Sequence, residues 1–269
     1  MSNLRLAIPS TGALYEDSIN FLQKKNLEIN RLNSRKYTAN IPSLKNISVL
    51  FQRQSDITME LDNDSADIGI VGLDRYFESR LEKGNLEIMD KNLGFGHAKL
   101  VIAIPDSWID VNSMFDLADI SLEFRKKGRN MRIATKYPRL VNRFLRTNDV
   151  NFIDIVHISG GLEAAPIMGY ADIIADITAT GTTLKENDLR IIDDGIVIES
   201  QAVMICNYAS ILIDDEKINL FSTLYERVTN KSAKVFVDNI ENRYLQKFPE
   251  ETTKELNFFS SVFTSLSMD

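Results

Sequence analysis

The sequence alternates between short apolar runs and segments with helical spacing. Runs of strand length occur at 4–8, 47–52, 66–72, 99–105, 131–137, 151–159 and 171–177. Segments with helical patterns occur at 13–25, 56–65, 138–148 and 161–170. Strands that alternate with helices in this way are typical of α/β folds with largely parallel sheets. We therefore predict an α/β protein.

The remainder of the chain is predicted less simply. Residues 189–206 favour two strands around a turn at Asp194–Gly195. From residue 214 onward, apolar residues recur at three- and four-residue spacing, which predicts a mainly helical C-terminal extension. No internal repeat is evident.

Length and charge limit the possible functions. A chain of 269 residues can form one large domain or two of ordinary size. Its formal net charge of −7 disfavours a general attraction to nucleic acid or to anionic membranes. An anionic ligand would therefore have to bind through local backbone amides and a few well-placed cations.

The sequence offers little for disulfides or metal clusters. It has one cysteine, Cys206, and two histidines, His97 and His157, that lie far apart. No apolar run approaches the about 20 residues that a membrane-spanning helix needs, and no leader pattern opens the sequence. We expect a cytoplasmic protein that makes no metal cluster of its own.

The stretch "TATGTT" at 178–183 follows a predicted strand and is rich in small hydroxyl side chains. In an open parallel sheet, ligands bind beyond the carboxyl ends of the strands. Gly181 permits a tight turn, and the threonines can donate hydroxyl and amide hydrogens to a phosphate. Asp176 could accept hydrogen bonds from sugar hydroxyls or help to hold a divalent cation. The alternative is that a threonine merely caps the following helix; a Walker-type loop is excluded because no Gly-Lys-Ser/Thr occurs.

The segment "ADIIADITATGTTLKENDL" (171–189) resembles the phosphoribosyl-pyrophosphate-binding segment of the ATP phosphoribosyltransferase family. The resemblance rests on six segments in the same order and covers about residues 1–207. The other five are 4–18, 66–74, 93–105, 132–138 and 160–172.

This resemblance implies a two-domain fold like that of type II periplasmic binding proteins, with the active site in the cleft. Domain I would hold 1–103 plus 189–207, domain II would hold 104–188, and 208–269 would form the C-terminal extension. The implied enzyme is a glycosyltransferase of histidine biosynthesis. It joins N1 of ATP to C1 of phosphoribosyl pyrophosphate and releases pyrophosphate, with Mg²⁺ on the phosphates.

The resemblance also implies site residues. Asp176 and Glu163 would be catalytic, although Glu163 could equally be a first-turn glutamate that favours the helix dipole. Phosphoribosyl pyrophosphate would bind to Thr178, Ala179, Thr180, Gly181, Thr182 and Thr183. ATP would contact Arg35, Arg53, Asp74, Thr135, Lys136 and Tyr137. The "GFG" at 94–96 is interpreted as a hinge or tight turn.

The chain departs from the family pattern in its first loop. The family usually carries lysine, arginine or both around the glycine there, whereas this chain has Ser10, Thr11 and Ala13. Lys36, Lys99 or Lys136 could supply the missing charge. The main hypothesis is an active ATP phosphoribosyltransferase that forms homo-oligomers, with a separate regulatory subunit also possible. The second is a non-catalytic module of the same fold that binds a phosphorylated ligand or regulates a partner.

Overall fold

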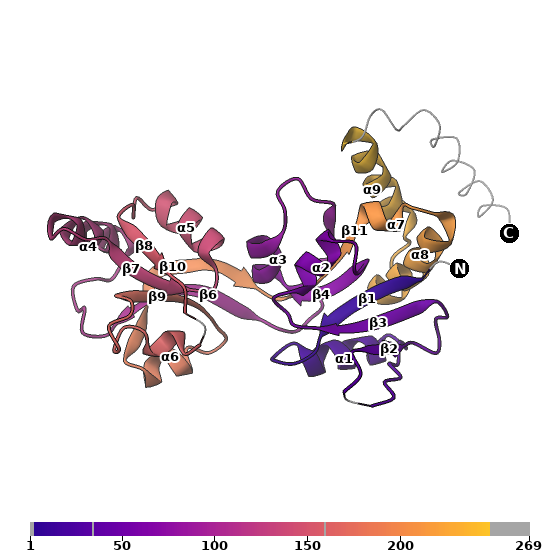
Figure 1. The fold of residues 1–269 in the computed structure, drawn as a ribbon, viewed down its shortest axis with the longest axis horizontal. Helices are drawn as coiled ribbons and strands as arrows, with labels where there is room; N and C mark the ends of the chain where they lie inside the picture. Colours follow the sequence, from indigo (N-terminus) through magenta and orange to yellow (C-terminus); the bar gives the residue numbers. More distant parts are fainter. Residues whose placement is uncertain (1–2, 34, 159, 248–269) are drawn as a thin grey trace. The chain divides into compact units, whose positions relative to one another are not determined.

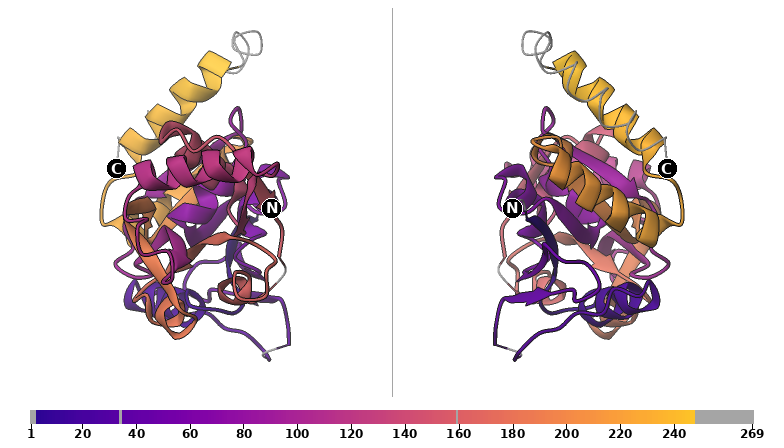
Figure 2. Two further views of the ribbon diagram at one scale, coloured as in Figure 1. Left: turned by 90° about the vertical axis from the view of Figure 1, so that its left-hand side faces the viewer. Right: turned by 90° about the vertical axis from the view of Figure 1, so that its right-hand side faces the viewer.

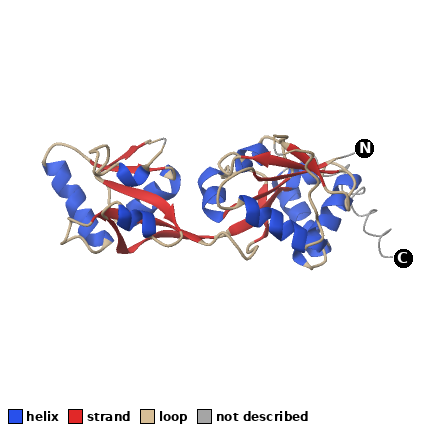
Figure 3. Ribbon diagram, turned by 90° about the horizontal axis from the view of Figure 1, so that it is seen from below, coloured by secondary structure: helices blue, strands red, loops and turns tan. Residues whose placement is uncertain are grey.

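The computed structural model describes residues 3–33, 35–158 and 160–247. The chain divides into two compact units, which are coloured along the sequence in Figure 1. Unit 1 comprises Met1–Gly96 and the chain from Ala202 onward, and unit 2 comprises His97–Gln201. The chain therefore passes from one unit to the other twice. In each unit, helices pack on a single sheet, as the colours of Figure 3 show, which confirms the predicted α/β fold class.

The sheet of unit 1 has six strands in the order β2-β3-β1-β4-β11-β5. Strands β1, β3 and β4 run parallel, and β11 is inserted antiparallel beside β4. The strands are β1 (Leu4–Pro9), β2 (Thr38–Asn40), β3 (Ile47–Gln52), β4 (Ile68–Gly72), β5 (Leu86–Asp90) and β11 (Ala202–Asn207). The helices are α1 (Tyr15–Lys24), α2 (Ile57–Asp62), α3 (Leu73–Ser79), α7 (Tyr208–Ile211), α8 (Asp215–Thr229) and α9 (Lys234–Lys247).

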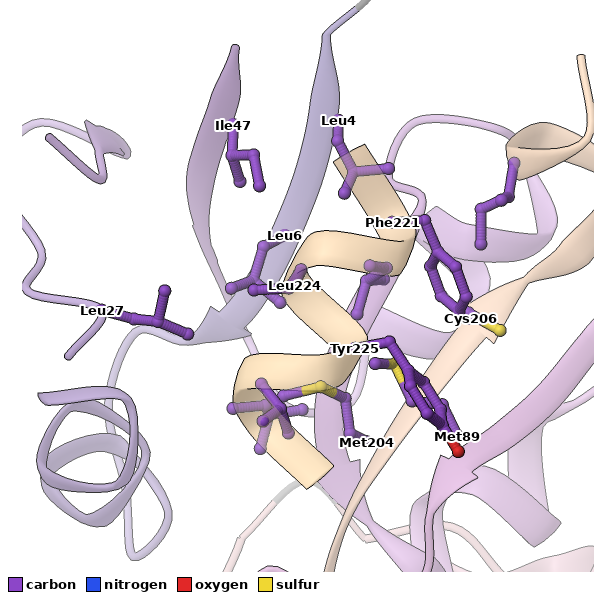
Figure 4. Packing of buried hydrophobic residues seen from close by; sticks show 14 of the residues in the cluster. Leu4, Leu6, Leu27, Ile47, Met89, Met204, Cys206, Phe221, Leu224 and Tyr225 are labelled. Carbon is purple, nitrogen blue, oxygen red and sulfur yellow. The ribbon is translucent and has the colours of Figure 1, made fainter. Parts of the chain in front are cut away.

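Apolar side chains cover both faces of this sheet. On one face, Phe221, Leu224 and Tyr225 of α8 lie in one apolar cluster with Leu4 and Leu6 of β1. Figure 4 shows Leu224 beside Leu6, Phe221 directed toward Cys206, and Tyr225 beside Met89. Helices α1 and α9 add buried residues to the same cluster. On the other face, α2 and α3 pack in a second cluster. The helical spacing from residue 214 onward thus produces the expected helices, α8 and α9 (orange and yellow in Figure 2), and they pack on the chain's own core. Residues 248–269 of the predicted extension lie outside the described residues.

The sheet of unit 2 has five strands in the order β10-β6-β9-β7-β8. The strands are β6 (Ala98–Pro105), β7 (Met131–Thr135), β8 (Ile153–Val156), β9 (Ile173–Thr178) and β10 (Leu189–Ser200). Helices α4 (Met114–Lys126) and α5 (Pro138–Thr147) pack on one face. The short helix α6 (Thr182–Glu186) and the 3-10 turn η1 (Leu162–Ala164) pack on the other, as Figure 1 shows for α6.

The two sheets share one topology. Each sheet has three parallel strands, β1, β3 and β4 in unit 1 and β7, β8 and β9 in unit 2. In each set the first strand lies between the other two, and an antiparallel strand, β11 or β6, pairs with the last of the three. This is the arrangement expected of a type II periplasmic-binding-protein-like fold. Each sheet contains an equivalent arginine–aspartate ion pair. In unit 1, Asp67 accepts hydrogen bonds from the backbone and guanidinium of Arg5. In unit 2, Asp172 accepts them from the backbone and guanidinium of Arg132. The structure therefore contains a repeat that the sequence did not reveal.

Two local predictions were wrong. Residues 189–200 form one long strand, with no turn at Asp194–Gly195. Strand β10 pairs with β6 before and after this point, and a register shift between Ile191 and Ile196 accommodates the extra residues. The carboxylate of Asp194 accepts a 2.7 Å hydrogen bond from the N–H of Met114 at the start of α4. The helix predicted at 161–170 is only the 3-10 turn η1.

The pairing of β10 with β6 also places 189–200 in unit 2, whereas the sequence-based boundaries placed this segment in domain I. Within the described residues, no helix has both the length and the apolar character needed to cross a bilayer.

Candidate functional site

The carboxyl edge of the unit 2 sheet gathers most of the predicted site residues of that unit. Strands β7, β8 and β9 run parallel, and Thr135 at the end of β7 lies opposite Ala175 of β9. The segment Thr135–Lys136–Tyr137 and the loop at 178–183 therefore leave the sheet at the same edge. Ligands of open parallel sheets bind at such an edge.

Residues 178–183, the threonine loop, form a turn that is closed by hydrogen bonds between the loop's own residues. The hydroxyl oxygen of Thr178 accepts a 2.8 Å hydrogen bond from the N–H of Gly181, and the hydroxyls of Thr180 and Thr182 lie 2.8 Å apart. Gly181 has a φ of 78°, in the left-handed region, and no heavy atom lies within 4 Å of the position that a Cβ would occupy. The backbone conformation at this position, rather than a lack of space, therefore requires glycine. Ala179, Thr180, Thr182 and Thr183 are exposed.

Alternation along β9 directs Asp176 toward the face of the sheet that carries α6. Ile173 and Ala175 pack against α4 and α5, whereas Ile174 packs in the opposite cluster. Asp176 and Thr178 therefore project from the same face as Ile174. Asp176 is half-buried, and its carboxylate accepts a 2.8 Å hydrogen bond from the N–H of Ile177.

Glu163 lies in η1, on this same face. Its neighbour Leu162 is buried in one cluster with Ile174 of β9 and Leu184 of α6. Glu163 itself is half-buried, and η1 follows Gly161, whose φ is 54°. The structure thus brings the Glu163 segment, Asp176 and the threonine loop to one face of unit 2.

The predicted ATP contacts of unit 2 differ in exposure. The side chains of Thr135 and Tyr137 are buried, and the Thr135 hydroxyl accepts a 3.0 Å hydrogen bond from the N–H of Tyr137. Both residues help to begin α5, and Tyr137 packs against α4 and α5. Only Lys136 of this segment is exposed.

Unit 1 presents a second carboxyl edge, with Arg53 after β3 and Asp74 after β4. Arg53 is exposed, and Asp74 is 4% exposed. Gly72 allows this packing, since a Cβ on it would lie 2.4 Å from a carboxylate oxygen of Asp74. Arg35 is exposed in the loop before β2, and its backbone N–H donates to the side chain of Asn33.

Sequence reasoning missed Arg31, a cation near the first loop. Its guanidinium lies 3.9 Å from the ring centroid of Phe51, and its Nε donates a 2.7 Å hydrogen bond to the carbonyl of Lys36. The Nη1 of Arg31 also lies 3.5 Å from the hydroxyl oxygen of Tyr15. The backbone N–H of Tyr15 in turn donates a hydrogen bond to the carbonyl of Gly12 in the first loop. Nothing in the local pattern distinguishes Arg31, because its position depends on Phe51, which is distant in sequence.

Asp172, part of the family-like segment, has a structural role. It accepts two hydrogen bonds from Arg129, at 2.7 and 2.9 Å, and three from Arg132. Burial alone would raise the pKa of the Asp172 carboxyl, but these hydrogen bonds lower it to about 2. The first aspartate of the segment therefore braces the sheet, whereas Asp176 lies beside the loop.

A hollow of about 410 Å³ adjoins the threonine loop within unit 2. Its lining residues are His97, Ala98, Lys99, Ala179, Glu199, Ser200 and Gln201. Across the described ranges, no three histidine, cysteine or acidic side chains form a group that could hold a metal ion.

Known proteins resemble this chain in sequence. The model of the HisG family, described as ATP phosphoribosyltransferase, matches residues 53–228. An ATP phosphoribosyltransferase of Mesorhizobium japonicum is 38% identical over 86% of this chain and 99% of its own length. One from Chelativorans sp. is 41% identical over 74% of this chain and 88% of its own.

A solved structure shares the fold as well. The ATP phosphoribosyl transferase (HisG:HisZ) complex from Thermotoga maritima aligns with a TM-score of 0.63 at 28% identity. The alignment covers 84% of this chain and 97% of that one. The agreement in sequence and fold leads to one conclusion: this chain belongs to the ATP phosphoribosyltransferase family.

Proposed function

We propose that this chain carries out its family's reaction, the transfer of a phosphoribosyl group to N1 of ATP in histidine biosynthesis, at the residues gathered around β9. The observation that carries the proposal is the closed threonine loop beside Asp176. The reaction yields phosphoribosyl-ATP and pyrophosphate, and ATP and phosphoribosyl pyrophosphate are its substrates.

The chemistry suits this site. Displacement at C1 develops positive charge on the ribose and negative charge on the departing pyrophosphate. The protein contributes mainly by positioning the reactants and by stabilising these charges. In this proposal, the amides and hydroxyls of 178–183 bind the 5-phosphate, and Asp176 accepts hydrogen bonds from the ribose hydroxyls. Glu163 approaches the ribose from η1, on the same face.

The proposed ATP contacts are the cations and end-of-strand residues of the two carboxyl edges. Arg35 and Arg53 in unit 1 are exposed and suited to bidentate phosphate contacts, and Asp74 lies beside Gly72. In unit 2, Lys136 is the best candidate contact because its side chain is exposed, whereas those of Thr135 and Tyr137 are buried. The hydrogen bond between Thr135 and Tyr137 fixes the backbone on either side of Lys136.

Magnesium is part of the proposal as a companion of the phosphates. Mg²⁺ is usually bound through one or two carboxylates together with substrate phosphates, rather than by an all-protein cage. The described residues offer no such cage, and Asp176 is a single half-buried carboxylate near the loop, so this donor set fits a magnesium that arrives with pyrophosphate. When bound, the ion neutralises charge on the leaving group.

We further propose that the chain acts in the cytoplasm and assembles into homo-oligomers, with a separate regulatory subunit as a possible partner. The Thermotoga maritima structure, described as a HisG:HisZ complex, supports an assembly with a second kind of chain. A sizing measurement of the purified chain, alone and with a candidate partner, tests this part.

The experiment that tests the function is product formation. Purified protein with ATP, phosphoribosyl pyrophosphate and Mg²⁺ should form phosphoribosyl-ATP, detected by near-ultraviolet absorbance and by chromatography. Omission of any one of the three should abolish the signal. Binding of phosphoribosyl pyrophosphate without product would instead favour the non-catalytic module.

A further inference from the structure

Lys99, Thr178 and Glu199 form a row across three neighbouring strands. Lys99 of β6 pairs with Thr178 of β9 on one side and with Glu199 of β10 on the other. The Nζ of Lys99 lies 2.9 Å from a carboxylate oxygen of Glu199. The lysine side chain is 50% exposed, so ligands can reach it.

Alternation along β6 places Lys99 on the same face as the predicted site. Leu100 and Ile102 pack against α4 and α5, whereas Val101 and Ala103 belong to the cluster with Leu162 and Leu184. Lys99 therefore projects from the face of Val101, which is also the face of Asp176 and Thr178. The lysine thus flanks the beginning of the threonine loop.

The hollow described above connects this cation to the loop. Lys99 and Glu199 line it together with Ala179, which follows Thr178 directly. Its volume of about 410 Å³ lies within the usual range of small-molecule sites. An acidic chain that binds a polyphosphate needs cations at such a position, and the first loop supplies none.

We propose that Lys99 binds the phosphate held by the threonine loop, and that Glu199 holds Lys99 in place until the phosphate displaces it. This inference rests on the proposed function and identifies the group at this site as the 5-phosphate of phosphoribosyl pyrophosphate. An exposed ion pair contributes little stability, so exchanging its partner costs little. A lysine suits the exchange because its ammonium is a compact charge on a flexible stem. The Glu199 carboxylate competes for the same ammonium and repels the incoming phosphate.

The two members of the pair should therefore have opposite effects on binding. Lys99→Met removes the cation and is expected to raise the KM for phosphoribosyl pyrophosphate about tenfold, while kcat changes less than about twofold, because the 5-phosphate does not react. Lys99→Arg should restore most of the affinity. Glu199→Gln removes the competitor and should lower this KM about twofold to threefold. The KM for ATP should stay constant in all three variants.

Kinetics of the wild type and these variants, at saturating ATP and Mg²⁺, provide the first test. Opposite shifts in KM for Lys99→Met and Glu199→Gln support the proposal. If both variants stay within twofold of the wild type, or both shift in the same direction, the pair is only a surface salt bridge and the proposal is wrong.

Direct binding separates this inference from the proposed function. Calorimetry with phosphoribosyl pyrophosphate and with ribose 5-phosphate, without ATP, needs no turnover. Weaker binding of both ligands to Lys99→Met supports the proposal even if the wild type makes no product. Weaker binding of phosphoribosyl pyrophosphate alone would place Lys99 at the pyrophosphate and overturn the assignment. Absence of binding to the wild type would overturn it as well.

Discussion

The hydroxyl oxygen of Thr178 accepts a hydrogen bond of 2.8 Å from the backbone N–H of Gly181. Because this contact lies within the threonine loop, the loop's own residues hold it in a turn that a phosphate can enter. Preorganisation of this kind reduces the ordering cost of binding. The predictions below test this loop and the features that support it.

The left-handed backbone of Gly181 provides the first prediction. Gly181→Ala should destabilise the folded loop by about 1 kcal/mol, because a Cβ disfavours a φ of 78°. We expect the KM for phosphoribosyl pyrophosphate to rise several-fold, and Gly181→Val to be more severe. Gly128→Ala is a matched control, since Gly128 has a φ of 86°, equally open surroundings and a place at the end of α4. Equal kinetic effects of the two alanine variants would remove the loop from the account.

Asp176 in β9 and Asp172, directly before β9, should respond differently to substitution by asparagine. Asp176→Asn should lower kcat/KM for phosphoribosyl pyrophosphate by about 100-fold, in the range of groups that act on the transition state, and leave stability nearly unchanged. Asp172→Asn should lower the free energy of unfolding by about 2 kcal/mol, because it weakens five hydrogen bonds from arginines. The folded Asp172→Asn protein should keep near-normal kinetics. The reverse pattern would contradict the assigned roles.

Asp172 should also produce a specific acid dependence of stability. Its pKa is about 2 in the folded protein, below the usual 3.8, so its contribution is present above pH about 4 and is lost as the pH falls toward 2. Asp67 should act in the same direction in unit 1: burial raises its pKa, but hydrogen bonds from Arg5, Lys217 and Ser210 lower it overall. Urea unfolding between pH 2 and 5 should show a shallower pH dependence for Asp172→Asn than for the wild type. An identical pH dependence of the free energy of unfolding in both proteins would contradict a stabilising role for the Asp172 carboxylate.

Glu241 of α9 should show the opposite dependence. Burial, and secondarily the nearby Asp238, raise its pKa from 4.5 to about 7, and its Oε1 is buried with no hydrogen-bond partner among the described residues. The stabilisation from its neutral form is therefore present below pH about 4.5 and is lost as the pH rises through 7. Glu241→Gln should be more stable than the wild type at pH 8 by about 1 kcal/mol, after allowance for solvent screening, and nearly equal at pH 5. Thermal unfolding at both pH values measures this, and an equal difference at both would refute it.

Local pattern predicted most of the strands but not their partners. The apolar runs became β1, β3, β4, β6, β7, β8 and β9. Two strands are predicted within residues 189–206, with the turn at Asp194–Gly195, but the structure places the break at Gln201, between β10 and β11. The long partner strand β6 keeps β10 continuous, and Asp194 caps α4, about 80 residues away in sequence. The apolar pattern alone does not predict α4, although the sequence contains the capping box that Ser113 and Asp116 form at its start.

Local sequence likewise predicts some residues of the candidate site, whereas the placement of others depends on tertiary packing. The threonine loop and Asp176 lie within one short segment, so local residue types were enough to predict them. The burial of Thr135 and Tyr137 depends on how α4 and α5 pack, which no local pattern contains. The position of Lys99 beside Thr178 depends on the register of two strands about 80 residues apart. The matched Arg5–Asp67 and Arg132–Asp172 pairs became visible as a repeat only through the shared topology.

The most direct test of the central claim is a crystal structure with phosphoribosyl pyrophosphate and Mg²⁺. We predict that the 5-phosphate oxygens lie within hydrogen-bonding distance of amides and hydroxyls between Thr178 and Thr183, with the ribose hydroxyls near Asp176. An ordered ligand elsewhere on the protein, with residues 178–183 making no contact to it, would contradict the account.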